Sequence, residues 1–192
     1  MTDRNQEDLR YMQMALDMAK LGRGYTNPNP MVGAVIVKDG QVIAKGYHHC
    51  CGQGHAEVEA FKDAGNQDVT GATIYVTLEP CSHYGKTPPC ADKIIEKKIG
   101  RVVVGALDPN PLVAGRGIEK IRNAGIEVTT GVLAEESIKL NEIFMKYIVN
   151  KEPFVLYKSA MSLDGKIATA SGESQWISCE TSRKEVHELR HQ

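Results

Sequence analysis

One histidine and two cysteines in this chain have the side chains needed to bind a metal ion. His55 precedes Cys81 and Cys90 along the sequence, and Glu57 lies two residues after the histidine. One imidazole and two thiolates are sufficient protein ligands for a catalytic zinc ion, whose fourth position stays open for water. The sequence therefore predicts a zinc site at His55, Cys81 and Cys90, with Glu57 available to move protons.

The chemistry expected of such a site is hydrolysis at a carbon that carries an amine. Zinc lowers the pKa of a bound water to about 7, which gives hydroxide at neutral pH. Glu57 would take the water proton, protonate a ring nitrogen and help ammonia leave. His55-Ala56-Glu57 and Pro80-Cys81 also match the H-x-E and P-C signature of zinc deaminases, which favours this interpretation.

A structural zinc site is the alternative. It would need a fourth protein ligand, for which Cys50, Cys51 or His83 is available. A structural site would leave Glu57 without a task, so we favour catalysis. Cys50, Cys51 and Cys179 have no partner at metal-binding spacing, and we interpret them as bystanders.

The elements that must position these residues form one predicted α/β domain over residues 1–150. Apolar periodicity and β-branched runs give the order α-β-β-α-β-α-β-α-β-α, a mixed sheet with helices on both faces. The last helix is predicted over Ala134–Val149. His55 opens one helix, while Cys81 and Cys90 bracket the loop into another. Because both helices follow strands, their N-termini should meet at one end of the sheet and lower the thiol pKa there.

The remaining residues, 151–192, are predicted to begin a second domain. Lys151-Glu152-Pro153 interrupts the pattern, and Phe154–Met161 reads as a new strand. About 40 residues are too few to close an independent α/β core. We therefore expect an incomplete domain, whose exposed apolar surface favours a homo-oligomer.

Composition narrows the classes of partner. The 192 residues are 42% hydrophobic and 24% charged, with a formal net charge of −1 and no Lys/Arg-rich run, so no nucleic-acid surface is expected. The acidic start is not a secretory signal, and no apolar run is long enough to span a membrane. Five cysteines without such a signal favour reduced thiols and a cytoplasmic location.

The spacing between the two cysteines is unusual for a zinc deaminase. Deaminases commonly have C-x-x-C, whereas eight residues separate Cys81 from Cys90. This longer segment resembles the bifunctional deaminase/reductase family of riboflavin biosynthesis, and it reads T-L-E-P-C-S-H-Y-G-K-T-P-P-C from Thr77 to Cys90. The resemblance continues through three further segments, residues 29–33, 108–117 and 162–168.

The resemblance implies a fold, a substrate and a second activity. The fold is a cytidine-deaminase-like three-layer α-β-α sandwich with a mixed five-stranded sheet, followed by an incomplete dihydrofolate-reductase-like segment. The substrate is a small phosphorylated diaminopyrimidinone with a ribosyl-5-phosphate amino group, which deamination converts to the pyrimidinedione and ammonia. The family's reductase domain uses NADPH to reduce the ribosyl group.

Two other functions stay open on the residues alone. A nucleoside or transfer-RNA deaminase would favour the short cysteine spacing, and one acting on RNA would need a basic groove, and this chain has neither feature. A non-catalytic, zinc-stabilised binding module would keep its function when Glu57 is replaced.

The resemblance also implies substrate contacts in the deaminase domain. Lys86 would meet the phosphate, although an isolated lysine is ordinarily a solvated surface residue. Asp108 and Asn110 would bind ribose hydroxyls or phosphate, although Asp-Pro-Asn-Pro forms a turn regardless of function. Asn29 resembles the residue that hydrogen-bonds the pyrimidine. His48 would contact the substrate, although a histidine at this place can equally be an exposed loop residue.

Four residues of the C-terminal segment resemble positions in the reductase domain. Ala160 and Trp176 correspond to positions at NADP, and Ser174 and Arg190 to positions at the reductase substrate. A lone tryptophan is more often a core or interface aromatic. With the domain incomplete, we expect no formed reductase pocket, so the chain should deaminate but not reduce.

Overall fold

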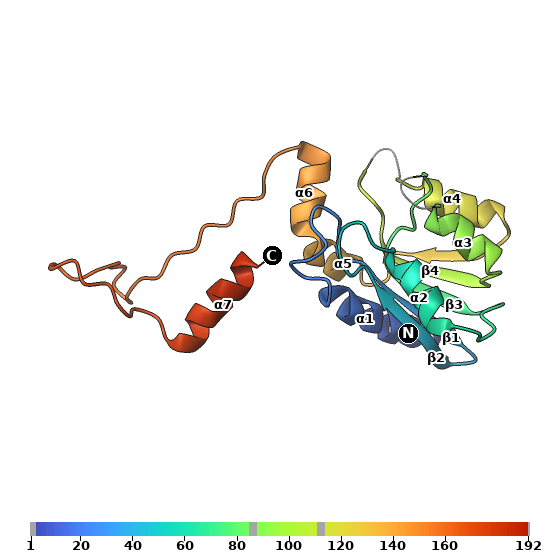
Figure 1. Cartoon of the computed structure of the whole chain (residues 1–192), viewed down its shortest axis with the longest axis horizontal. Helices are drawn as coiled ribbons and strands as arrows, with labels where there is room; N and C mark the ends of the chain where they lie inside the picture. Colours follow the sequence, from blue (N-terminus) through green and yellow to red (C-terminus); the bar gives the residue numbers. More distant parts are fainter. Residues whose placement is uncertain (1–2, 85–87, 111–113, 192) are drawn as a thin grey trace. The chain divides into compact units, whose positions relative to one another are not determined.

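The computed structural model describes residues 3–84, 88–110 and 114–191 and contains two compact units, Met1–Pro153 and Phe154–Gln192 (Figure 1). The first unit holds the sheet and the predicted metal ligands. Each unit is described by itself below. No helix among the described residues is both long and apolar enough to cross a membrane.

The first unit contains the predicted mixed sheet of five strands, in the spatial order β2-β1-β3-β4-β5. The first strand pairs antiparallel with both of its neighbours, while the last three strands run parallel to one another. Parallel pairing places the carboxyl ends of β3 and β4 side by side, where ligands commonly bind in α/β proteins. The strands are β1 (Gly33–Lys38), β2 (Gln41–Tyr47), β3 (Thr73–Leu78), β4 (Arg101–Ala106) and β5 (Glu127–Thr130).

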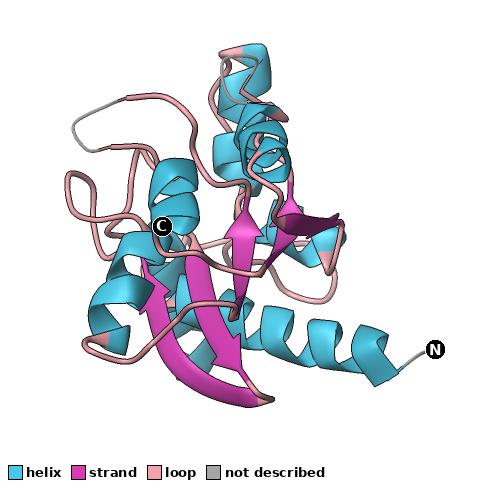
Figure 2. Cartoon of the chain, turned by 90° about the vertical axis from the view of Figure 1, so that its right-hand side faces the viewer, coloured by secondary structure: helices cyan, strands magenta, loops and turns pink. Residues whose placement is uncertain are grey.

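Helices cover both faces of this sheet, which confirms the three-layer α-β-α architecture (Figure 2). One face carries α1 (Asp3–Lys20) and α5 (Ala134–Leu140). The other face carries α2 (Ala56–Ala64), α3 (Cys90–Glu96) and α4 (Arg116–Asn123). Both helices that begin at a predicted metal ligand, α2 and α3, therefore belong to the same layer.

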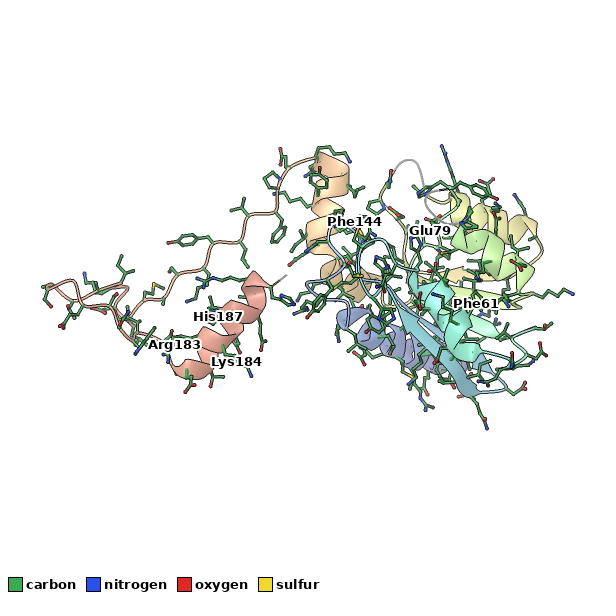
Figure 3. The ribbon with its side chains drawn as sticks, viewed as in Figure 1. Phe61, Glu79, Phe144, Arg183, Lys184 and His187 are labelled. Carbon is green, nitrogen blue, oxygen red and sulfur yellow. The ribbon has the colours of Figure 1, made fainter. Side chains whose placement is uncertain are left out.

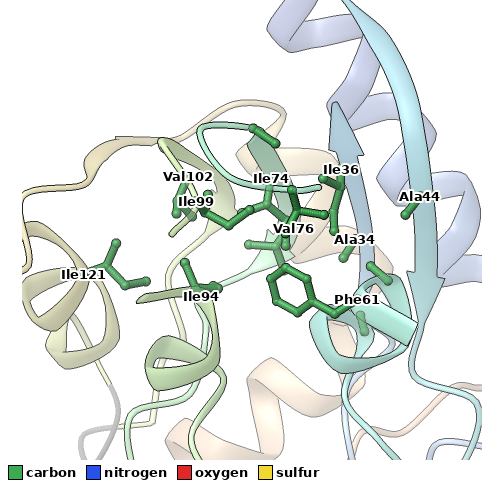
Figure 4. Packing of buried hydrophobic residues seen from close by; sticks show 14 of the residues in the cluster. Ala34, Ile36, Ala44, Phe61, Ile74, Val76, Ile94, Ile99, Val102 and Ile121 are labelled. Atoms are coloured by element: carbon green, nitrogen blue, oxygen red, sulfur yellow. The ribbon is translucent and has the colours of Figure 1, made fainter. Parts of the chain in front are cut away.

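The core beneath that layer fixes where α2 and α3 begin. Phe61 of α2 and Ile94 of α3 are buried against Ile74, Val76 and Val102 of the central strands (Figure 4). Alternate residues of each strand point to opposite faces, so the same strands also supply the core under α1. Burial of an apolar side chain contributes roughly 1.5–3 kcal/mol, so this packing holds both helices firmly on the sheet.

The prediction of one helix over Ala134–Val149 was wrong. The structure has two helices there, α5 and α6 (Glu142–Asn150), which are separated at Asn141. The buried Asn141 amide accepts a hydrogen bond from the Met31 amide at 2.7 Å and donates one to the Met31 carbonyl at 2.8 Å. Apolar periodicity alone cannot reveal a break that a distant backbone partner imposes.

The predicted strand Phe154–Met161 was also wrong. These residues form no strand, and the helix of the second unit is α7 (Glu180–Arg190), which the sequence analysis did not predict. A strand needs a neighbour to satisfy its backbone hydrogen bonds, and the described part of this unit supplies none.

Candidate metal centre and active site

The three predicted metal ligands lie together although they come from separate elements. His55 precedes the first residue of α2 in an extended conformation, Cys81 follows β3, and Cys90 is the first residue of α3. The Nδ1 atom of His55 is 3.5 Å from the Cys81 sulfur and 3.3 Å from the Cys90 sulfur. All three ligand atoms lie within 4.8 Å of one another.

This geometry fits a tetrahedral zinc ion. Ligand atoms placed 2.0–2.3 Å from a common tetrahedral centre are separated by roughly 3.3–3.8 Å, which matches the distances around His55. Among the residues that the structure describes, no fourth histidine, cysteine or carboxylate joins the group. Cys50, Cys51 and His83, considered above as ligands of a structural site, lie outside it. The open fourth position favours a catalytic site over a structural one.

Hydrogen bonding within the cluster shifts the pKa values of its two thiols in opposite directions. A hydrogen bond from the Cys90 thiol, together with His55, lowers the pKa of Cys81 to about 4. The Cys90 backbone amide, at the start of α3, also donates to the Cys81 sulfur at 3.3 Å. The hydrogen bond between Cys90 and Cys81, together with burial, raises the pKa of Cys90. The hydrogen bond between His55 and Cys81 raises the pKa of His55 to about 8. Because a metal takes deprotonated ligands, its binding must release protons here.

Glu57 lies beside the cluster without belonging to it. Its carboxyl is buried in the first turn of α2. Burial, and secondarily the negative charge of Cys81, raises the pKa of Glu57 to about 7. A carboxyl with this pKa can both accept and donate a proton near neutral pH, which is the property required of a proton shuttle.

The cluster opens into a pocket of about 240 Å³. Four of the five predicted substrate-binding residues line this pocket: Asn29, His48, Asp108 and Asn110. The fifth, Lys86, lies outside the described residues. Other lining residues were not predicted, and they include Val32, Leu78, Glu79, His83, Phe144 and Ile148.

His48 is buried, and its hydrogen bonds define its tautomer. Its Nδ1 lies 3.0 Å from the Gly54 carbonyl oxygen, which can only accept, so Nδ1 carries the proton. Its Nε2 then accepts from the Asn29 amide nitrogen at 3.1 Å. Burial lowers the pKa of His48 and so keeps the ring neutral. This pair turns the amide nitrogen of Asn29 toward His48 and its carbonyl oxygen away from it.

Asp108 and Asn110 line the pocket from a turn after β4. The Asn110 amide donates to the Asp108 carboxylate at 2.9 Å, which is the local turn chemistry expected from their residue types. Burial raises the pKa of Asp108, and the nearby charge of Glu79 adds to this effect. Turn formation and pocket lining are therefore compatible at these two positions.

Two apolar residues of α6 line the pocket. Phe144, which is labelled in Figure 3, and Ile148 are spaced four residues apart and so lie on one side of that helix. The Asn141–Met31 hydrogen bonds hold the start of α6 next to the segment that carries Asn29. Helical spacing in the sequence could have identified this face, but only the fold shows what it covers.

The second unit has a pocket of its own, of about 440 Å³. Ser174 and Trp176 line it, whereas Ala160 and Arg190 do not. The Trp176 side chain is 69% exposed, with the Arg183 guanidinium 4.3 Å from its ring centre. The four predicted reductase residues are thus not gathered into one site within this unit.

Comparison with known proteins identifies the class of this domain. Residues 5–106 match the family described as the cytidine and deoxycytidylate deaminase zinc-binding region. This segment contains His55, Glu57, Cys81 and Cys90, and the chain belongs to that family. Residues 153–192 match the RibD C-terminal domain.

Two relatives in the comparison are named for riboflavin biosynthesis. The chain is 55% identical to riboflavin biosynthesis protein RibD of Aquifex aeolicus over 183 residues, 95% of this chain and 51% of that protein. It is 50% identical to the Escherichia coli protein of the same name, over 97% of this chain and 50% of that one.

A solved structure agrees with this likeness. A diaminohydroxyphosphoribosylaminopyrimidine deaminase/5-amino-6-(5-phosphoribosylamino)uracil reductase from Thermotoga maritima superposes with a TM-score of 0.93 at 52% identity, covering 97% of this chain and 54% of that one. The chain therefore spans about half the length of the relatives it matches.

Proposed function

We propose that this chain is a zinc-dependent deaminase of riboflavin biosynthesis. Its substrate would be 2,5-diamino-6-(5-phosphoribosylamino)pyrimidin-4(3H)-one, and its products 5-amino-6-(5-phosphoribosylamino)uracil and ammonia. The observation that carries this proposal is the buried Glu57 beside the His55, Cys81 and Cys90 cluster, in a pocket of about 240 Å³. The name of the Thermotoga maritima protein supplies the substrate class, and that of the Aquifex aeolicus protein the pathway.

The reaction exchanges an amine for an oxygen by hydrolysis. His55, Cys81 and Cys90 would hold the zinc ion, which would supply a water whose pKa is lowered to about 7. Glu57 would take a proton from the attacking water as the water oxygen bonds to the amine-bearing ring carbon, and would pass this proton to the ring nitrogen. Glu57 then takes the second proton of the added water and delivers it to the amine, so that the carbon–nitrogen bond breaks and ammonia leaves.

The pocket residues have distinct expected roles in holding the substrate. The Asn29 carbonyl oxygen, oriented by the neutral His48, would accept a hydrogen bond from the pyrimidine. Asp108 and Asn110 would bind the ribose hydroxyls, and Lys86 the phosphate. Phe144 would cover one face of the ring, since an aromatic side chain packs well on a flat heterocycle.

We further propose that residues 1–150 are the deaminase domain and that residues 151–192 begin the reductase domain. The match of residues 153–192 to the RibD C-terminal domain supports this division. A complete reductase domain would use NADPH to reduce the ribosyl group, with Ala160 and Trp176 at the cofactor and Ser174 and Arg190 at the substrate. We expect this chain to release ammonia without consuming NADPH, to act in the cytoplasm without nucleic acid, and to self-associate.

Replacing Glu57 tests the proposed function. The Glu57→Gln variant keeps the shape of the side chain but cannot shuttle protons, so kcat should fall by roughly 10²- to 10⁴-fold. Ammonia release from the pyrimidine is measured in the zinc-loaded protein, and zinc content is measured in parallel. Zinc content should stay unchanged because Glu57 is not a member of the ligand cluster.

A neighbouring carboxylate provides the matched control. Glu59 lies on the same helix, pairs with Lys62 and does not line the pocket, so Glu59→Gln should retain activity. Absence of ammonia from the zinc-loaded wild type would refute the proposed function. Full activity in Glu57→Gln would refute the role of Glu57.

A further inference from the structure

The buried side chain of Glu79 gathers backbone amides from one loop. Its Oε2 accepts hydrogen bonds from the amides of Asp108 at 3.3 Å and Gly115 at 2.9 Å. Its Oε1 accepts from Gly117 at 3.0 Å and more weakly from Ile118 at 3.5 Å. One carboxylate therefore bonds both ends of the loop that leads from β4 into α4.

These bonds replace a cap that α4 lacks. The position before its first residue is Gly115, with a φ of 77°, and glycine has no side chain to satisfy the free amides of the first turn. Glu79 supplies the missing acceptor from a neighbouring segment, and its negative charge is favoured at a helix N-terminus. Without Glu79, the half-buried amides of Asp108 and Gly115 and the buried amide of Gly117 would lose this acceptor.

The segment after β3 and the first turn of α4 lie close together. A Cβ atom added at Gly117 would lie 1.9 Å from the Pro80 carbonyl oxygen, so only glycine fits there. The Glu79 backbone amide donates to the Ala106 carbonyl at 3.0 Å, which extends the pairing of β3 with β4. Glu79 is thus fixed by the sheet on one side and holds the loop on the other.

The clamped loop carries two pocket residues, Asp108 and Asn110. Glu79 bonds the Asp108 amide directly, and Asp108 in turn accepts from the Asn110 amide. We propose that Glu79 is a positioning residue, whose carboxylate clamps the loop after β4 and so sets the places of Asp108 and Asn110 for the sugar phosphate of the substrate. This proposal rests on the proposed function for the identity of the substrate.

A positioning role differs measurably from a merely structural one. Chemistry depends on Glu57 and the metal ligands, which lie on other segments, so a loosened loop should weaken binding and leave kcat nearly intact. In Glu79→Gln, one oxygen becomes an amide NH2 group, which cannot accept the bonds that the carboxylate accepted. About half of the clamp is lost, and we expect KM to rise roughly tenfold, kcat to change less than about threefold, and zinc content to be retained.

Two measurements on the zinc-loaded protein test this inference. Steady-state deamination of the pyrimidine gives KM and kcat. Hydrogen exchange gives the protection of the amides of Gly115 and Gly117, and at least one of these two amides should lose protection in Glu79→Gln. Asp8→Asn is the matched control, because it disturbs a buried carboxylate on the opposite face of the sheet. Asp8→Asn should leave KM unchanged, even if it lowers the stability of the protein more than Glu79→Gln does.

The outcomes separate this inference from the proposed function. Unchanged protection of the two glycine amides in Glu79→Gln would overturn the clamp, and this result does not depend on turnover. Loss of protection with an unchanged KM, or an equal rise in KM in Asp8→Asn, would overturn the positioning role. A wild type that releases no ammonia would instead count against the proposed function, while the exchange measurement would still decide the clamp.

Discussion

A buried ion pair anchors α1 to the sheet, and Asp8→Asn should break it. Arg101 of β4 donates to both Asp8 carboxylate oxygens, each at 2.7 Å, and the Tyr75 hydroxyl donates to one of them at 3.0 Å. Arg101 also donates to the Thr129 hydroxyl at 2.9 Å, so the network joins α1, β3, β4 and β5. Asparagine has nearly the same shape as aspartate but carries no charge.

The cost follows from the burial of both partners. The side chains of Asp8 and Arg101 are 4% and 12% exposed, so solvent screens the pair little. Removing one member of a buried pair typically costs about 3–5 kcal/mol. Arg101 keeps a partner in Glu127, whose carboxylate is 3.3 Å from Nε but not aligned for a hydrogen bond. We therefore expect Asp8→Asn to lower the free energy of unfolding by about 3 kcal/mol and Tm by roughly 6–12 °C.

The loss should also depend on pH. Burial alone would raise the pKa of Asp8, but the hydrogen bonds from Arg101 and Tyr75 outweigh it and lower the pKa below its ordinary value of 3.8. A carboxyl whose pKa is lower in the folded state stabilises the protein above its unfolded pKa, and this contribution is lost as pH falls through the folded value. The difference in Tm between wild type and Asp8→Asn should therefore be full at pH 7 and shrink as pH approaches 3.

Thermal unfolding of the zinc-loaded proteins, followed by circular dichroism from pH 7 to pH 3, tests this prediction. Asp17→Asn is the control on the same helix, since its pair with Lys20 is exposed and should contribute less than about 0.5 kcal/mol. A Tm difference for Asp8→Asn no larger than that of the control would refute the argument from burial. A large difference that persists unchanged at pH 3 would refute the assignment to the charge of Asp8.

Two further predictions concern the site itself. Zinc uptake by metal-free protein should release protons at pH 7, because the pKa of His55 is raised to about 8 and that of Cys90 is raised as well. A pH indicator records this release, and uptake without it would contradict these protonation states. The KM for the pyrimidine should be constant near neutral pH, because burial lowers the pKa of His48. KM should rise only at acid pH, where the protonated ring can no longer accept a hydrogen bond from Asn29. A KM that already rises between pH 8 and pH 7 would show that His48 is not held neutral.

Local patterns were sufficient to predict most of the fold. The order of helices and strands up to the last predicted helix agrees with the structure, because turn residues and β-branched runs delimit these elements. The metal ligands could also be predicted from the sequence, because one histidine, two cysteines and a glutamate that is not a ligand form a pattern that few sites share. These features depend on residue type and spacing within one segment, and the sequence displays both directly.

The features that were missed depend on contacts between distant segments. Asn141, where the last predicted helix divides, bonds Met31, more than a hundred residues earlier. Phe144 lines the pocket from α6, the helix that begins after this break. Glu79 stands in the same motif as Cys81, yet nothing in the motif shows that its partners are the amides around Gly115. Long-range pairing of this kind leaves no periodic signal in the sequence.

Glu79 and Cys81 show how one short segment can serve two parts of the site. Cys81 joins the metal cluster, while Glu79, two residues earlier, clamps the loop that carries Asp108. The intervening Pro80 has no amide hydrogen and a fixed φ, so it limits the freedom of the segment, and its carbonyl packs against Gly117. The residues that follow β3 therefore carry both a metal ligand and the carboxylate that bonds the loop after β4.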